Sequence, residues 1–162
     1  MELAGAGGKW KTINELKDTT VIQQENDVSC GAACGKMVFK QKGIDVEQEQ
    51  IRANSGSPTW SEQLAYAMNQ LSSSEDGEWK GGYFKITGAT ALQVFLSLCS
   101  TGSWIAELRE PLKKMGHFVV VDGIDEEEKP LIRDPWDGTR YKMETEEFLK
   151  HWNQQGVFWR KK

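Results

Sequence analysis

The sequence contains few cysteines, few histidines and no long apolar run. Its 162 residues include three cysteines, which cannot all pair, and no stretch approaches the length that crosses a bilayer, so we expect no membrane span. The net charge of −4 offers no electrostatic attraction to nucleic acid, so we expect no nucleic-acid partner. The two histidines are His117 and His151. Any chemistry that needs an imidazole is therefore confined to two positions.

The length and composition indicate one globular domain. A chain of 162 residues can bury about two thirds of its unfolded surface, and its 38% hydrophobic content is ordinary for a protein with a packed core. The first eight residues, MELAGAGG, are mostly small. We expect residues 1–8 to be a linker or a disordered start, as in a domain excised from a longer protein. Residues 9–162 are then the single domain.

The stretch QQENDVSCGAAC, residues 23–34, is the part of the chain around which the rest is organised. From Cys30 onward, small or apolar residues recur at the spacing of one buried helix face, which predicts a helix that begins at Cys30 and ends near Gly43. The free amides and the positive dipole end of a helix N-terminus favour the thiolate, which is the nucleophilic form of cysteine. The plain alternative is that Cys30 and Cys34 are two small core residues.

The rest of the chain changes from helical to β-rich periodicity. Further helices are expected to begin near residues 45 and 59 and to span residues 91–99 and 145–152. The helix at 91–99 is expected to bury Leu92, Phe95, Leu96 and Cys99. The expected strands are residues 83–86, 104–108, 118–124, 131–133, 139–143 and 157–159. Residues 72–82, rich in Ser, Gly and charge, are expected to form a surface loop. Helices followed by an antiparallel sheet predict an α+β fold.

A nucleophilic thiolate needs a base within hydrogen-bonding reach, and the two histidines differ in their surroundings. His151 lies near the end of the last expected helix, where a cation is favoured and a solvated surface position is usual. His117 follows Gly116 at the start of HFVVVDGI, the most β-prone run in the chain. We therefore take His117 as the candidate base.

The carboxylate that would orient His117 depends on the length of one turn. If the strand after His117 returns through a tight turn at residues 125–126, Asp134 lies directly opposite on the same face of the sheet. A longer turn, residues 125–129, puts Asp137 opposite instead. We favour Asp134 because the proline after it holds it extended, as the end of a strand requires.

Taken in order, these motifs resemble the papain-like cysteine peptidases, and specifically the bacteriocin leader peptidases that cut after a double glycine. The motifs are a glutamine six residues before the cysteine of CGAAC, a GHFVVV strand and a DPWDG turn. The resemblance implies that Cys30 attacks and that His117 acts as general base and then acid. It implies that Asp134 orients the histidine and that Gln24 contributes to the oxyanion hole. It also implies a papain-like fold, with the nucleophile at the start of a central helix and the N-terminal helices packed on a C-terminal antiparallel sheet.

Two departures from that branch bear on the function. Ser29 stands where the family usually has an acidic residue, and the leader peptidases are commonly joined to a membrane transporter, which this sequence does not contain. The linker-like start also resembles the papain-fold domains of bacterial polymorphic toxins. We therefore expect a cysteine hydrolase that acts on an amide bond of a target protein, as a protease, a deamidase or a related acyl-transfer enzyme. The alternatives are a leader-processing double-glycine peptidase and a catalytically inactive binding module on the same fold.

The expected partners follow from this interpretation. We expect a protein or peptide substrate and, for a toxin, a cognate immunity protein. Thiol chemistry requires reducing conditions, so the expected site of action is the cytoplasm, reached as part of a larger secreted protein. We expect neither a cofactor nor a metal, because Cys30 and Cys34 are one helical turn apart, which is not a usual zinc spacing, and a fourth ligand is lacking.

Overall fold

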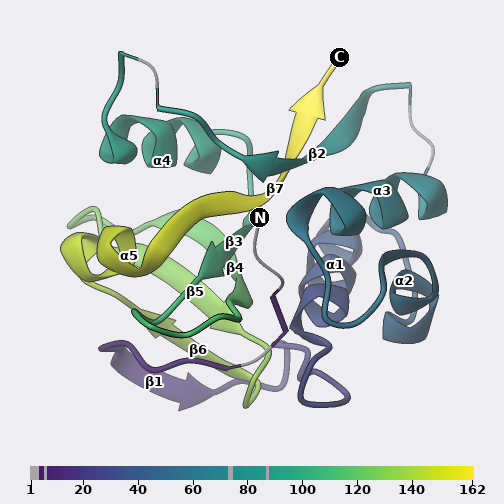
Figure 1. Ribbon diagram of the computed structural model, residues 1–162, viewed down its shortest axis with the longest axis horizontal. Coiled ribbons are helices and arrows are strands. Elements are labelled where there is room, and N and C mark those ends of the chain that lie inside the picture. Colours follow the sequence, from purple (N-terminus) through teal and green to yellow (C-terminus); the bar gives the residue numbers. More distant parts are fainter. Residues whose placement is uncertain (1–3, 6, 73–74, 87) are drawn as a thin grey trace.

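The computed structural model describes residues 4–5, 7–72, 75–86 and 88–162, which form helices on both faces of one antiparallel sheet (Figure 1). The helices are α1 (Cys30–Gln41), α2 (Gln48–Ser55), α3 (Ser61–Leu71), α4 (Ala91–Cys99) and α5 (Thr145–His151). The strands are β1 (Ile13–Lys17), β2 (Gly77–Tyr83), β3 (Trp104–Leu108), β4 (His117–Ile124), β5 (Pro130–Asp134), β6 (Thr139–Lys142) and β7 (Trp152–Lys161). The predicted α+β class is confirmed.

Strand β4 lies at the centre of the sheet, whose order is β1-β6-β5-β4-β3-β7-β2. Its first five residues are all buried, because helices cover both faces of the sheet at this point. Burial on both faces explains why β4 reads as a continuous apolar run rather than as an alternating strand. The chain thus places His117 at the start of a strand whose first five residues are buried.

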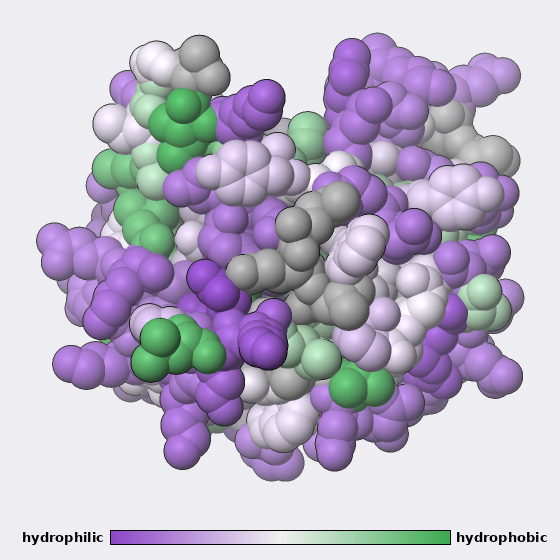
Figure 2. All heavy atoms as spheres, viewed as in Figure 1, coloured by the Kyte–Doolittle hydropathy of each residue, from purple (hydrophilic) through white to green (hydrophobic). Residues whose placement is uncertain are grey.

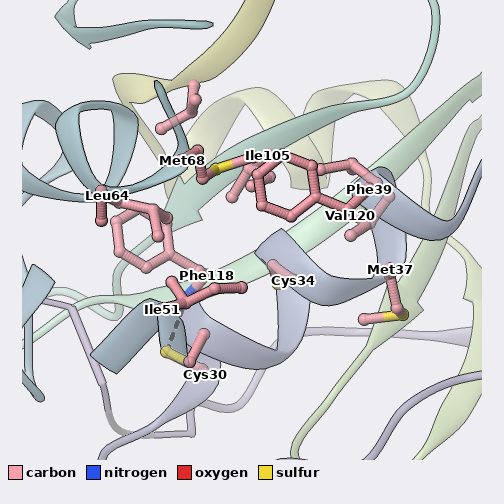
Figure 3. Packing of buried hydrophobic residues seen from close by; sticks show 14 of the residues in the cluster. Cys30, Cys34, Met37, Phe39, Ile51, Leu64, Met68, Ile105, Phe118 and Val120 are labelled. Carbon is pink, nitrogen blue, oxygen red and sulfur yellow. Dashed lines mark hydrogen bonds between the residues drawn. The ribbon is translucent and has the colours of Figure 1, made fainter. Parts of the chain in front are cut away.

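The two faces of the sheet carry separate hydrophobic clusters. On one face Phe118 and Val120 pack with the side chains of α1, α2 and α3, with α1 lying directly on the sheet (Figures 1 and 3). On the other face Val119 and Val121 pack with α4 and α5. The alternation along β4 follows from the period of two in a strand. Helix α1 is consequently held between the sheet and the other two N-terminal helices.

Two glycines allow α1 to lie close to its neighbours. A Cβ atom on Gly31 would lie 2.9 Å from a methyl carbon of Thr59 and 3.2 Å from the ring of Phe118. A Cβ on Gly35 would lie 3.0 Å from Ile51 in α2. A side chain at Gly31 would crowd Thr59 and β4, and a side chain at Gly35 would crowd α2. The absence of side chains at Gly31 and Gly35 therefore allows this close packing.

Helix α4 has the predicted bounds, but its buried face differs from the prediction. Phe95 is buried as expected, and Leu98 is buried beside it. Leu92 and Leu96 are 40% and 37% exposed, and Figure 2 shows apolar side chains gathered on the surface over α4. Cys99 is partly buried against the second cluster. A helix as apolar as α4 gives a weak periodic signal, so the sequence did not distinguish its inner from its outer leucines.

The segment between α3 and α4 was predicted wrongly. Residues 77–82, expected in a surface loop, belong to β2, whereas residues 84–86 are not part of a strand. Residues 73–74 of the expected loop lie outside the described residues. Glycine is frequent in β2 because the strand runs close to α3: a Cβ on Gly81 would overlap the carbonyl oxygen of Ser61. The composition typical of a loop here reflects close packing.

The N-terminal region contains contacts that the sequence did not predict. Residues 13–17 form β1, which pairs with β6 and is mostly exposed, so it has no apolar alternation to reveal it. Within the expected linker, Ala4 and Gly5 form backbone hydrogen bonds with Thr59 and Gly116, and Ala4 is fully buried. Residues 1–3 and 6 of that linker lie outside the described residues. Ala4 and Gly5 therefore contact both the loop before α3, at Thr59, and the residue before β4, Gly116.

We expect Gly156→Ala to lower the free energy of unfolding by about 1–3 kcal/mol, the usual cost of overpacking. Gly156 in β7 is paired with Ala106 on one side and Gly82 on the other, and its Cβ would overlap the carbonyl oxygen of Ile105. Urea unfolding measures the change. The control Ser97→Ala, on the exposed side of α4, should stay within about 0.5 kcal/mol. Equal stability of the two variants would show that β3 and β7 tolerate separation.

Candidate active site

The site begins where α1 meets β4. Cys30 is the first residue of α1 and is fully buried. Its Sγ accepts a hydrogen bond from the backbone N of Phe118 at 3.3 Å, which is drawn as a dashed line in Figure 3. Ser29, which precedes it, makes no side-chain cap on the helix and instead bonds with Asn26 in the loop. The Cys30 sulfur is therefore tied directly to the strand that carries His117.

His117 is the first residue of β4 and is 1% exposed. Its Nε2 is 2.7 Å from Oδ1 of Asp134. Its Nδ1 is also buried and has no hydrogen-bond partner of ordinary geometry among the described residues. The ring of Trp10 stacks on the imidazole at a centroid distance of 6.0 Å, and the ring of Trp136 meets it edge-on at 6.3 Å. The imidazole is thus held by a carboxylate and two indole rings.

Asp134, the last residue of β5, is itself held by two further donors. The backbone N of Trp136 donates to Oδ1 at 2.9 Å, and the hydroxyl of Tyr141 donates to Oδ2 at 2.7 Å. The Tyr141 oxygen in turn accepts a hydrogen bond from Nε1 of Trp10 at 2.8 Å. Trp10 therefore contacts the histidine with its ring face and supports the carboxylate through Tyr141. This chain of bonds fixes the orientation of the carboxylate.

The His117–Asp134 contact is present, although the hairpin register predicted for it is wrong. The turn is the longer one, residues 125–129, and Val120 pairs with Arg133. In this register the position opposite His117 is residue 136, two residues beyond Asp134. Residues two apart on a strand share a face, so Asp134 reaches the imidazole diagonally. Asp137, the alternative acid for a long turn, is exposed.

Electrostatics favour the charged forms of the pair. Burial by itself lowers the pKa of His117, but the Asp134 carboxylate and the Cys30 side chain outweigh it and raise this pKa to about 10 from its usual 6.5. For Asp134, burial alone raises the pKa, but the charge and hydrogen bond of His117 dominate together with the two other donors and lower it. Burial raises the pKa of Tyr141, which keeps its hydroxyl proton available for donation. The site therefore holds an imidazolium beside a sulfur atom at neutral pH.

Gln24 lies in the loop that leads to α1, and its exposed fraction is 9%. Its backbone N donates to the carbonyl oxygen of Pro135 at 2.8 Å, which fastens this loop to the residue after Asp134. Its Nε2 donates one proton to the carbonyl oxygen of Asn26 at 2.8 Å, and among the described residues no acceptor is found for its second amide proton. Gln24 and Trp136 both line a cavity of about 320 Å³.

The remaining cysteines and histidine have other surroundings. Cys34 packs in the first hydrophobic cluster, where burial raises the pKa of its thiol well above the usual value. His151 was expected at a solvated position, but it is 7% exposed: its Nε2 lies 3.4 Å from Oε2 of Glu147, and its Nδ1 lies 3.3 Å from the carbonyl oxygen of Arg109. Trp10 lies against His151 as well as His117. Among the described residues, no group of three His, Cys, Asp or Glu side chains is arranged to hold a metal ion.

Three site residues were missed from the sequence. Tyr141 could have been found by pairing the two expected strands, residues 131–133 and 139–143, as a hairpin. In the observed hairpin Tyr141 pairs with Ile132, and Asp134 lies two residues from Ile132 on the same face. Trp136 follows Asp134 so closely that its backbone N was a plausible donor. Trp10 had no such signal, since its contacts with Tyr141 and with the imidazole join segments far apart in the chain. Contacts of that kind depend on the tertiary fold alone.

Comparison with known proteins places this chain in a family. The model of the Peptidase_C39 like family matches residues 16–157. Over 154 residues, the chain is 36% identical to "Cysteine protease effector 1" of Escherichia coli O1:K1:H7, and the match covers 95% of this chain and 29% of that protein. The chain thus spans less than a third of the length of this relative.

Two solved structures share the fold. The peptidase domain of Streptococcus ComA, a bi-functional ABC transporter, has a TM-score of 0.68 and 20% identity, over 85% of this chain and 95% of that one. A double glycine motif protease from an AMS/PCAT transporter, solved with its leader peptide, has a TM-score of 0.64 and 21% identity over the whole of both chains. The expected papain-like arrangement, with the nucleophile position at the start of a central helix, is therefore confirmed. The chain belongs to the Peptidase_C39 like family.

Proposed function

We propose that this domain hydrolyses an amide bond in a protein or peptide through a covalent thioester on Cys30, and that it works as the peptidase of a bacterial effector. The observation that carries the proposal is the closed arrangement at the junction of α1 and β4. The Cys30 sulfur is bonded to the strand that begins with His117, and His117 is bonded to Asp134. A nucleophile, a base and an orienting acid in this order are the requirements of acyl transfer.

Each of the three residues has a defined task in the first half of the reaction. The sulfur of Cys30 attacks the carbonyl carbon, and the raised pKa of His117 keeps a proton ready for the leaving nitrogen. Asp134 holds the imidazole in place and stabilises its positive charge. Nδ1 of His117 is the ring atom that the carboxylate leaves free, so it is the atom that serves the sulfur and the leaving group. Water then hydrolyses the thioester, with His117 accepting its proton.

The developing oxyanion needs hydrogen-bond donors. One is available in the loop before the nucleophile, and another at the start of the helix that contains it. The backbone N of Cys30 lies at the helix N-terminus, where backbone amides have no partner within the helix. The side-chain amide of Gln24 has one proton not used by Asn26. Donors held in place before the reaction stabilise the transition state without a cost of reorganisation. We assign the oxyanion hole to these two groups.

The effector role is supported by the relative with the higher identity. The 36% identical protein is named a cysteine protease effector, whereas the transporter peptidases share about 20%. We infer a protein substrate in a target cell, a reducing cytoplasm as the site of action, and a cognate immunity protein in the producing cell. None of the helices in the described part of the chain has the length and apolarity needed to cross a membrane.

Leader processing is the second candidate function. It is favoured by the resemblance to a double glycine motif protease that was solved with its leader peptide. The two candidates differ in substrate and share their chemistry. Incubation with a synthetic double-glycine leader and, separately, with a cytosolic extract from a susceptible bacterium distinguishes them. Leader processing requires cleavage of the leader, whereas the effector role requires cleavage of a protein in the extract.

We expect Cys30→Ala to reduce peptidase activity by at least about 10³-fold and to leave the fold intact, since it removes a covalent nucleophile. Cys34→Ala is the matched control one helical turn away. It should keep activity and lose about 1 kcal/mol of stability, because Cys34 only packs in the core. Activity assays and urea unfolding of both variants measure the two effects. Full activity in folded Cys30→Ala would refute the proposal.

We expect Asp134→Asn to depress turnover by less than the roughly 10⁴-fold loss of a serine triad, because the imidazolium here exists before attack. The change removes the carboxylate that raises the pKa of His117, so that pKa should fall toward 6.5. Two-dimensional NMR of the imidazole nitrogens across pH 5–11 measures the shift. Asp137→Asn is the control and should change neither quantity, because Asp137 is exposed. A larger effect at Asp137 would mean that the orienting acid is misassigned.

A further inference from the structure

Ala4 and Gly5 lie between the two sides of the candidate active site, which are the helical side at Thr59 and the sheet side at Gly116. The backbone N of Ala4 donates to the carbonyl oxygen of Thr59 at 2.9 Å, and the N of Thr59 donates back to Ala4 at 3.0 Å. On the opposite side, the N of Gly5 donates to the carbonyl oxygen of Gly116 at 3.0 Å. In Figure 1 this purple segment passes between α1 and the sheet on its way to β1. Ala4 and Gly5 thus bind as an added strand, which is a common mode of peptide recognition.

The residues that hold this segment flank the reacting groups. Gly116 immediately precedes His117. Thr59, on the other wall, packs its methyl group against Gly31, the residue after Cys30. The carbonyl oxygen of Val28, two residues before Cys30, lies against Gly5. The backbone of Gly5 is therefore bounded by the neighbours of both the nucleophile and the base.

The position of Gly5 accepts no side chain. A Cβ atom there would lie 2.8 Å from Cβ of Pro58 and 2.9 Å from the carbonyl oxygen of Val28. One of these contacts is with backbone, which cannot turn aside as a flexible side chain would. Ala4 is fully buried, so its own position accepts only a small residue. The groove therefore fits a small residue followed by glycine, which is what the chain itself supplies.

Beyond Gly5 the chain continues past the other side of the histidine. A Cβ on Gly7 would lie 2.6 Å from the ring of Trp136, which meets the His117 ring edge-on. Trp10 stacks on the His117 ring, and its Nε1 donates a hydrogen bond to the hydroxyl oxygen of Tyr141. Gly5 therefore lies at the groove beside Thr59, and Gly7 lies against Trp136 near the imidazole. In the sequence, the bond after Gly5 comes between these two anchored parts.

We propose that Ala4 and Gly5 occupy the groove as a substrate does and that the domain cleaves its own chain between Gly5 and Ala6. This inference rests on the proposed function, since it uses the same nucleophile. It adds a self-processing activity and identifies its cleavage site. In a longer chain, such a cut would separate the domain from whatever precedes it. Until the cut is made, the segment excludes other substrates from the groove.

The reaction uses only groups of this chain and water. The sulfur of Cys30 bonds to the carbonyl carbon of Gly5, and the bond from that carbon to the nitrogen of Ala6 breaks. The imidazolium of His117 gives its proton to this nitrogen, which becomes the new amino terminus. Water then adds to the thioester carbon and gives a proton to His117, the carbon–sulfur bond breaks, and the thiolate returns. The products are a carboxylate at Gly5 and a chain that begins at Ala6.

The test is the intact mass of the purified full chain under reducing conditions at neutral pH. The parent protein should lose residues 1–5, whereas Cys30→Ala should keep them. Gly5→Leu should also remain uncut, because its side chain meets Pro58 and Val28. A synthetic peptide of residues 1–12 is the second probe. Gly5→Leu should cleave this peptide after Gly5 faster than Cys30→Ala does, because its own segment no longer fills the groove.

Each other outcome overturns a stated part of the account. A parent protein that keeps residues 1–5 but cleaves the added peptide refutes self-processing and leaves the proposed function standing. Cleavage after Gly8 instead of Gly5 refutes the placement of the bond. Gly5→Leu that loses its first residues as fast as the parent refutes the groove's selection of glycine. If neither chain nor peptide is cut and Cys30 forms no acyl adduct with any peptide ester, the proposed function itself fails.

Discussion

The contact between the start of α1 and the start of β4 is the constraint on which the rest of the structure depends. It brings Cys30 to the backbone of Phe118, the residue after His117, from a distant part of the sequence. Gly31 makes the approach possible, since a side chain there would meet Thr59 and Phe118. Burial of β4 on both faces then favours one register, because a shift of one residue would exchange the side chains that pack in its two clusters.

A second set of contacts fixes the charge at this junction. Asp134 receives hydrogen bonds from His117, from a backbone amide and from Tyr141, so its charge is fully compensated although it is buried. Trp10 joins this set through Tyr141 and through the imidazole. Ala4 and Gly5, which precede Trp10 in the chain, occupy the groove. Under the proposed function, substrate access and the support of the His117–Asp134 pair therefore depend on the same N-terminal stretch, and that coupling gives self-processing a physical basis.

The sequence predicted the elements that repeat a pattern and failed where packing is long-range. The start of α1, the end of β4 and the bounds of β3 and α4 follow from periodicity and glycine stops. Strand β1 is exposed and β2 is rich in glycine, so neither has a strand pattern. The turn after β4 was predicted too short, yet Asp134 was still the partner of His117, because both residues share a face in the observed register. The role of Trp10 could not be predicted from the sequence, because its contacts, His117 and Tyr141, lie more than 100 residues along the chain.

The central claim is that Cys30 carries the acyl group, and acid quenching of a reaction with an activated peptide ester tests it most directly. Mass spectrometry of the quenched protein, with fragmentation that separates Cys30 from Cys34, locates the modified residue. The account predicts one acyl group per chain, on Cys30, and none on Cys34 or Cys99. Product formation with the acyl group on another residue, or with no acylated protein under rapid quench, would contradict it.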